Sequence, residues 1–257
     1  MKLPDFFIIG ASRSGTNSLR CTLATHPKIN PSSRRECHFF DWTYHKGLEH
    51  YKRYFPARGL TFDTTPNYLY SSEAPARIKK DTPSSSHRFI VLLRNPAKRA
   101  WSNFWHFKKK TWLPPGPGEI LRRGRYAEYL ARWFNHFPKH RFMIIKAEDF
   151  FRASKLTANT IIRELLGLKP LINQSRYYDP KRPDPKTRTP YPAPEPEMAE
   201  YLMNYYRPHN QRLYDLLGVD FLWESEPFPN LKKGAIYANF SDTKNTTGHP
   251  GTTGRSG

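Results

Sequence analysis

Short apolar runs alternate with segments of helical periodicity along most of this 257-residue chain. The apolar runs lie at Phe6–Ile9, Phe89–Leu93 and Phe142–Ile145, with a weaker run at Leu60–Asp63. Continuous apolar runs this short are typical of parallel strands that are buried on both faces. Helical patterns are expected over Thr16–Thr25, Gly47–Tyr54, Ala74–Lys80, Ala97–Lys109, Arg125–Phe137, Leu156–Leu166 and Met198–Leu217, with Gly218 as the stop signal of the last helix. The alternation predicts an α/β fold of three layers, in which helices flank a central parallel sheet.

Two segments depart from this pattern. The segment Pro180–Pro196 holds seven prolines and is expected to be a long loop, whose basic residues would suit a lid over an anion. From Gly234 onward the chain is rich in Gly, Thr, Ser and Asn, a composition typical of disorder. We therefore expect one domain over residues 1–230 and a disordered tail over residues 231–257.

A turn bounded by Gly10 and Gly15 follows the first apolar run, and a helical pattern begins directly after it. Backbone N–H groups of such a turn point at one spot, and the helix dipole adds partial positive charge there. Arg13 adds a full charge. The predicted anion-binding loop consists of Arg13, Ser14, Gly15, Thr16, Asn17 and Ser18. The alternative is an ordinary strand, turn and helix without a ligand.

The spacing of Gly10 and Gly15 matches that of a Walker A loop, but Thr16 stands where the Walker lysine would be. That lysine would grip the β- and γ-phosphates of ATP. Because the cation lies inside the loop at Arg13, a phosphate on the 5′ side of a nucleotide is the better match. The loop therefore predicts a P-loop-like fold. A P-loop kinase for a small alcohol stays an alternative, which would also need a Mg²⁺ site.

Arg94 ends the run Phe89–Leu93, and Pro96 opens the next helical pattern. Ser102 follows about a turn and a half into that helix. A strand-end arginine and a helix hydroxyl can converge on one phosphate. We predict such a clamp at Arg94 and Ser102, with a purely structural role as the alternative.

Glu36, His38 and Asp41 lie close together in sequence among aromatic residues. A carboxylate beside apolar rings can have a raised pKa and act as a base. Group transfer to a hydroxyl needs a base for the proton and a cation near the leaving oxygen. Glu36 would be that base and Arg13 that cation. The alternative makes Glu36 a surface ion-pair partner of a neighbouring arginine and His38 a core histidine.

The charge balance narrows the class of partner. Lys and Arg number 42 against 22 Asp and Glu, a formal charge of +20. Such an excess favours an acidic partner, either a nucleic acid, an anionic polysaccharide or a membrane surface. A non-enzymatic binder of polyanions therefore stays open, and so does a degenerate enzyme that binds without catalysing.

The sequence says less about the cellular compartment of the protein than about its partner. Cys21 and Cys37 are too few for a disulfide framework, and no metal-ligand set is apparent. No run approaches the roughly 20 apolar residues that a membrane helix needs. Three glycosylation sequons begin at Asn173, Asn239 and Asn245. If the source is eukaryotic and a membrane-anchor segment is missing from this sequence, we expect the protein in the Golgi lumen or membrane. Otherwise we expect a soluble, cytoplasmic protein. The oligomeric state stays open.

A series of short motifs follows along residues 4–223. They are the loop at Arg13, the segment Glu36–Pro56 with His38-Phe39-Phe40-Asp41, Thr65-Pro66-Asn67-Tyr68, Ser72–Arg77, Arg94–Ser102, Gly124-Arg125-Tyr126 with Trp133, and Tyr206-Arg207-Pro208-His209-Asn210. In this order they resemble the heparan sulfate sulfotransferases, the 3-O- and N-sulfating enzymes. The resemblance implies 3′-phosphoadenosine 5′-phosphosulfate as donor and a hydroxyl, or less readily an amine, of an acidic polysaccharide as acceptor. It implies no nucleic-acid partner.

The resemblance also implies roles for single residues. Glu36 matches the catalytic base, and we count His38 with Glu36 and Arg13 among the catalytic residues. His38 and Asp41 match contacts of the acceptor sugar, to which we add the neighbouring Arg35. Arg13 and its loop match the 5′-phosphosulfate site. Arg94 and Ser102 match the 3′-phosphate clamp. Lys186, Thr187 and Arg188 lie where the family has a Lys-Gly-Arg loop that covers the cofactor.

Three departures from the family pattern are visible. The family often has Glu-Lys before Ser/Thr-Pro, whereas Asp63-Thr64-Thr65-Pro66 lacks the lysine. The cysteine pair around the cofactor-covering loop is absent, and Thr187 replaces the glycine of that loop. The usual residue at the Arg13 position is lysine, and arginine keeps the charge with a different geometry.

Overall fold

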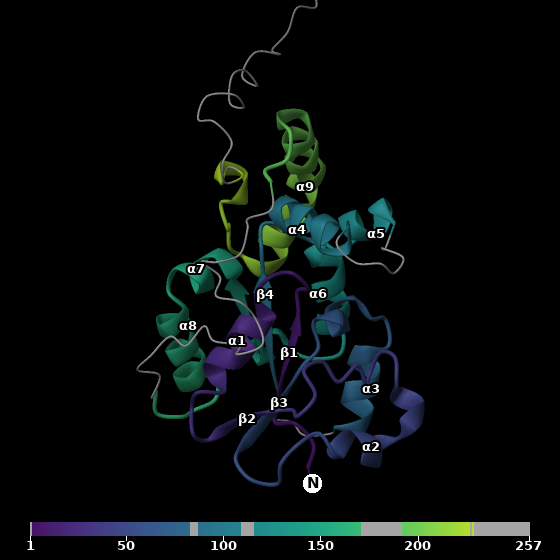
Figure 1. The fold of residues 1–257 in the computed structure, drawn as a ribbon, viewed down its shortest axis with the longest axis vertical. Coiled ribbons are helices and arrows are strands. Elements are labelled where there is room, and N and C mark those ends of the chain that lie inside the picture. Colours follow the sequence, from purple (N-terminus) through teal and green to yellow (C-terminus); the bar gives the residue numbers. More distant parts are fainter. Residues whose placement is uncertain (1, 83–86, 109–115, 171–191, 227, 229–257) are drawn as a thin grey trace, which may run out of the picture.

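A parallel sheet of five strands forms the centre of the molecule (Figure 1). The computed structural model describes residues 2–82, 87–108, 116–170, 192–226 and 228. The strands are β1 (Phe6–Gly10), β2 (Ile29–Pro31), β3 (Leu60–Thr64), β4 (Arg88–Leu93) and β5 (Phe142–Lys146), in the order β2-β3-β1-β4-β5. All pairs are parallel. The four predicted strands are confirmed. β2 was not predicted, because its three residues are too few to show an apolar run.

Helices connect the strands and cover both faces of the sheet (Figure 1). They are α1 (Thr16–Leu23), α2 (Leu48–Lys52), α3 (Ala74–Asp81), α4 (Pro96–Lys108), α5 (Pro117–Arg122), α6 (Tyr126–Phe134), α7 (Ala147–Arg152), α8 (Ser154–Thr160) and α9 (Pro196–Leu217). The pattern expected over Leu156–Leu166 divides into the end of α8 and a π-helix at Ile161–Leu165. α5 and α7 were not predicted, because six residues are too few to show helical periodicity.

Side chains of the central strands alternate between two cores. Phe6 and Ile8 of β1 join Ile90 and Leu92 of β4 against α1, α7 and α8. Phe7 and Ile9 point to the opposite face, where α6, α9 and the aromatic segment after β2 cover the sheet. Because both faces are buried, the strands are continuously apolar. The predicted three-layer α/β fold is confirmed.

The carboxyl ends of the parallel strands lie at one edge of the sheet. β1 is central, with β2 and β3 on one side and β4 and β5 on the other. The connections along the chain therefore build one side of the sheet first and then the other, with the change of side at β1. Open α/β sheets bind ligands at such a point, outside the carboxyl ends of the strands. Arg13 follows β1, Arg94 follows β4 and Glu36 follows β2. The topology therefore brings the three candidate segments to the same edge.

The last helix ends as the sequence predicts. Gly218 has a φ of 69°, and its N–H donates to the Tyr214 carbonyl at 2.7 Å. Lys186, Thr187, Arg188 and the tail over residues 231–257 lie outside the described residues. Of the segment Pro180–Pro196, only the part from residue 192 is described. Within the described part of the chain, no helix is both long enough and apolar enough to cross a membrane.

Candidate active site

The loop after β1 is shaped by two residues with left-handed backbone conformations. Arg13 has a φ of 71° and Gly15 a φ of 90°. The φ of Gly15 is one that residues with a Cβ rarely adopt, so a substitution there would strain the backbone. Thr16 then begins α1 and is buried, while Asn17 and Ser18 are half-buried in its first turn. The fully buried Ser14 hydroxyl has no hydrogen-bond partner among the described residues.

The loop and α4 bring together the two predicted phosphate contacts. Nε and Nη2 of Arg13 each donate to the Ser102 hydroxyl at 3.4 Å, and Nη1 lies 3.3 Å from Nδ1 of His106. Nη1 of Arg94 donates to the Arg13 carbonyl at 3.2 Å. The sequence predicts two separate phosphate contacts, but these side chains form one basic cluster.

Buried groups hold this basic cluster in place. The Tyr126 hydroxyl donates to the Arg94 carbonyl at 2.8 Å, and the Tyr70 hydroxyl accepts from the Ser12 N–H at 3.1 Å. The Asn95 side chain accepts from the N–H groups of Ala97 and Lys98 and so caps the start of α4. The cations therefore project from a rigid edge of the sheet.

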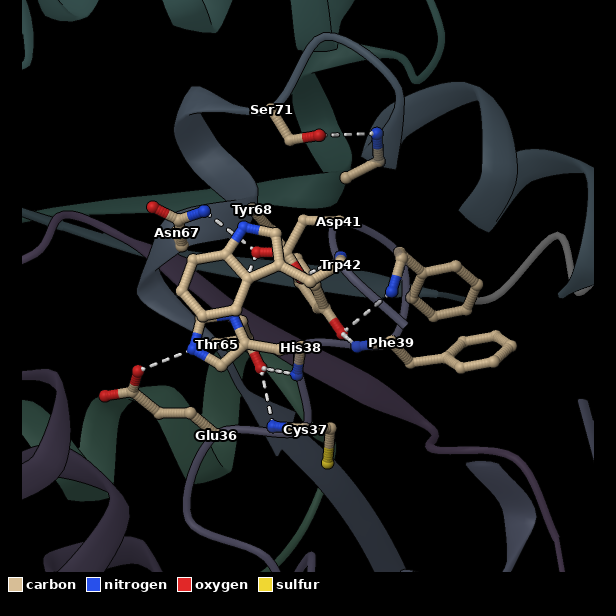
Figure 2. Close-up of polar contacts among 12 residues, drawn as sticks. Glu36, Cys37, His38, Phe39, Asp41, Trp42, Thr65, Asn67, Tyr68 and Ser71 are labelled. Atoms are coloured by element: carbon tan, nitrogen blue, oxygen red, sulfur yellow. Dashed lines mark hydrogen bonds and ion pairs between the residues drawn. The ribbon is translucent and has the colours of Figure 1, made fainter. Parts of the chain in front are cut away.

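Glu36, His38 and Asp41 are in direct contact (Figure 2). Nδ1 of His38 lies 2.9 Å from Oδ2 of Asp41, and Nε2 lies 3.1 Å from Oε2 of Glu36. The Asn67 side chain donates to the same Asp41 oxygen at 2.9 Å. The Asp41 side chain is 3% exposed and that of Glu36 is 44% exposed. Asp41 therefore fixes the imidazole from inside, whereas Glu36 is accessible from solvent.

The charge state of His38 follows from these two carboxylates. Burial opposes the charged imidazolium, but hydrogen bonds to Asp41 and Glu36 and the charges of both outweigh burial. Together they raise the pKa of His38 from 6.5 to about 9. At neutral pH the imidazolium therefore donates to both carboxylates and holds Glu36 in one orientation.

This raised pKa predicts a pH-dependent contribution to stability. A histidine whose pKa is higher in the folded protein stabilises it fully below the unfolded value of 6.5, and the effect is lost as pH rises through about 9. Urea unfolding of wild type and His38→Gln should therefore differ most below pH 6.5, with the difference shrinking toward pH 9. A difference that is the same at every pH would contradict this charge assignment.

A buried carboxylate at the end of β3 orders the segment that carries Glu36. Asp63 is fully buried and accepts from the hydroxyls of Thr65 at 2.7 Å, Tyr51 at 2.8 Å and Tyr68 at 2.9 Å. The Thr65 oxygen in turn accepts the Cys37 N–H at 3.0 Å, and the Tyr68 oxygen accepts the Phe39 N–H at 3.0 Å (Figure 2). Burial raises the pKa of Asp63, and the hydroxyl donors act in the opposite direction. Asp63 thus orients two hydroxyls whose oxygens hold the backbone between Glu36 and Asp41.

We expect Asp63→Ala to destabilise the fold by about 2–4 kcal/mol, because it leaves several buried hydroxyls without an acceptor. Asp149→Ala is the matched control, since Asp149 is exposed on α7 and makes one surface ion pair. Chemical denaturation of both variants measures the effect. Equal stabilities would show that the hydroxyls find other partners.

Sequence patterns named most of the side chains that the structure brings together here, but they missed His106 and the buried network around Asp63. His106 follows Ser102 by four residues on α4, and that helical spacing would have indicated a shared face. The roles of Asp63, Thr65 and Tyr68 depend on β3 and have no local signal. Arg35 is exposed, and Cys21 and Cys37 are both thiols.

Fold and site together define a P-loop-like α/β protein with a basic cluster and an accessible carboxylate at the carboxyl edge of its sheet. Residues 3–181 match the sulfotransferase domain family, and the chain belongs to that family. The predicted class, a sulfotransferase, is thereby confirmed.

Individual relatives agree with the family. The chain is 29% identical over 259 residues to human heparan sulfate glucosamine 3-O-sulfotransferase 6, covering 86% of this chain and 74% of that protein. It is 30% identical over 261 residues to the mouse 3-O-sulfotransferase 3B1, covering 87% of this chain and 65% of the relative. Mouse bifunctional heparan sulfate N-deacetylase/N-sulfotransferase 4 is 29% identical over 263 residues, with 84% of this chain but only 30% of that protein covered. The predicted resemblance to the heparan sulfate sulfotransferases is confirmed.

A solved structure shows the same fold. The sulfotransferase from Alicyclobacillus acidocaldarius superposes with a TM-score of 0.72 at 22% identity, covering 88% of this chain and all of that one.

Proposed function

We propose that this protein transfers a sulfuryl group from 3′-phosphoadenosine 5′-phosphosulfate to a hydroxyl of a glycosaminoglycan-like polysaccharide. The observation that carries the proposal is the placement of the Arg13 cluster and Glu36 at the same edge of the sheet. Relatives named for 3-O-sulfation of glucosamine in heparan sulfate support the acceptor class. The formal charge of +20 suits a polyanionic acceptor.

The loop after β1 fits the anionic donor. The buried Ser14 hydroxyl lacks a hydrogen-bond partner among the described residues, as expected for a group that binds a ligand. The left-handed Gly15 directly precedes α1, whose first-turn N–H groups and dipole attract an anion. Arg94 and Ser102 would hold the 3′-phosphate. Lys186 and Arg188 are further proposed contacts outside the described residues.

The chain's own groups account for the chemistry of transfer. The donor supplies an activated sulfuryl group and leaves as 3′-phosphoadenosine 5′-phosphate. Glu36 accepts the proton of the acceptor hydroxyl as its oxygen bonds to sulfur and the bond from sulfur to the 5′-phosphate oxygen breaks. That phosphate oxygen keeps the electron pair, and Arg13 with the loop amides stabilises the charge. His38 orients Glu36, and Asp41, whose side chain is 3% exposed, holds His38 from behind instead of meeting the acceptor as the sequence predicts. Arg35 would contact the acceptor from the surface.

Two other functions would give different behaviour. A kinase would turn over ATP with Mg²⁺, and a simple polyanion binder would keep its affinity when Arg13 and Glu36 are replaced. A Golgi location in a eukaryotic host stays a prediction.

Calorimetric titration with 3′-phosphoadenosine 5′-phosphate tests the donor assignment. We expect micromolar binding that ATP does not match, and a loss of about tenfold or more in Arg94→Ala because a charge-assisted contact is removed. Arg163→Ala is the control, since Arg163 is exposed and pairs with its neighbour Glu164. No binding by folded wild-type protein would refute the donor and make the polyanion binder the better reading.

A further inference from the structure

Trp42 is a large exposed aromatic side chain beside the accessible carboxylate. Trp42 is 63% exposed, and its indole lies parallel to the His38 imidazole, with ring centroids 3.8 Å apart and planes within 2° (Figure 2). Nε2 of that imidazole contacts Glu36 at 3.1 Å. One face of the indole is therefore covered by the active-site histidine, and the other face is left to solvent next to Glu36.

The backbone around Trp42 is firmly held. Its N–H donates to Oδ1 of Asp41 at 2.9 Å and approaches the His38 carbonyl at 3.3 Å. Nη1 of Arg77 donates to the carbonyls of Phe40 at 3.0 Å and Asp41 at 3.3 Å. With its ring stacked and its backbone bonded, Trp42 is already ordered. A ligand that packs on it therefore loses little to further ordering of the protein.

A rigid aromatic face in water is suited to a ligand with a flat apolar surface and a polar rim. The face of a pyranose ring that carries C–H bonds has this character, whereas its hydroxyls lie at the edge. We propose that the exposed face of Trp42 is a stacking platform for a pyranose ring of the acceptor, placed so that a neighbouring hydroxyl reaches Glu36. This inference rests on the proposed sulfotransferase function and adds to it a binding residue for the sugar.

Stacking and charge contribute to acceptor affinity in distinguishable ways. Attraction between exposed charges is screened by salt, but packing of an apolar sugar face on an indole is not. We expect Trp42→Ala to weaken acceptor binding roughly tenfold at every salt concentration, without changing the salt dependence. Trp42→Phe keeps an aromatic face and should recover most of the affinity.

The experiment is calorimetric titration of protein saturated with 3′-phosphoadenosine 5′-phosphate. The probe is a size-defined oligosaccharide of alternating glucuronic acid and N-acetylglucosamine, titrated over a salt series. Leu156→Ala is the matched control, because Leu156 is 69% exposed on α8. Unchanged binding of the nucleotide shows that each variant is folded. The rise in acceptor KM should exceed the fall in kcat.

Three outcomes would overturn the platform. They are equal affinity in wild type and Trp42→Ala, no oligosaccharide binding by wild type, and a shifted pH profile with unchanged KM. The last outcome would mean that Trp42 only shields His38. Binding that depends on Trp42, in a protein that transfers no sulfate, would instead refute the proposed function and leave the platform standing.

Discussion

Glu36→Gln is expected to lower kcat by about a hundredfold to ten-thousandfold, the usual contribution of a positioned general base. The amide has nearly the shape of the carboxylate and still offers an oxygen to Nε2 of His38, but it cannot take up the acceptor's proton. Because the Glu36 side chain is 44% exposed, the loss of its charge should change stability little. Affinity for 3′-phosphoadenosine 5′-phosphate should stay the same.

Single-turnover transfer of labelled sulfate, at saturating donor and acceptor, measures this effect directly. Glu49→Gln is the matched control, since Glu49 is an exposed glutamate on α2 that pairs with Lys52. An unchanged rate in Glu36→Gln would show that Glu36 is not the base.

Arg13→Ala is expected to reduce kcat by about a hundredfold to a thousandfold, as loss of one group that stabilises developing charge typically does. It should also weaken nucleotide binding, because the guanidinium forms part of the cluster with Ser102 and His106. Arg13→Lys keeps the charge and should recover part of the rate. Full recovery is not expected, because lysine lacks the planar fork that spans both partners.

Parallel measurements of transfer rate and nucleotide affinity separate the two roles of Arg13. Arg58→Ala serves as the control, because Arg58 is exposed just before β3, at the opposite edge of the sheet. If Arg13→Lys were no better than Arg13→Ala, positive charge at this position would not be what promotes transfer.

The strands of the sheet differ in how well local sequence patterns predict them. β1 and β4 could be predicted because burial on both faces requires continuous apolar runs. β5 has a similar apolar run, although it lies at the edge of the sheet and is only half-buried. β2 could not, since its residues Ile29–Pro31 belong to the sheet only through pairing with β3. α5 and α7 are likewise stabilised by tertiary contacts rather than by a visible repeat.

For the site, the sequence by itself determined the chemical groups: an arginine-bearing glycine loop, a strand-end arginine and a carboxylate beside a histidine. These are local features, because each depends on residues a few positions apart. Only the tertiary structure decided that Arg13, Arg94 and Ser102 form one cluster, and that Asp63 orders the segment carrying Glu36. The reason is physical. Such contacts join residues far apart in the chain, and their distances are set by the pairing of parallel strands, which no local pattern encodes.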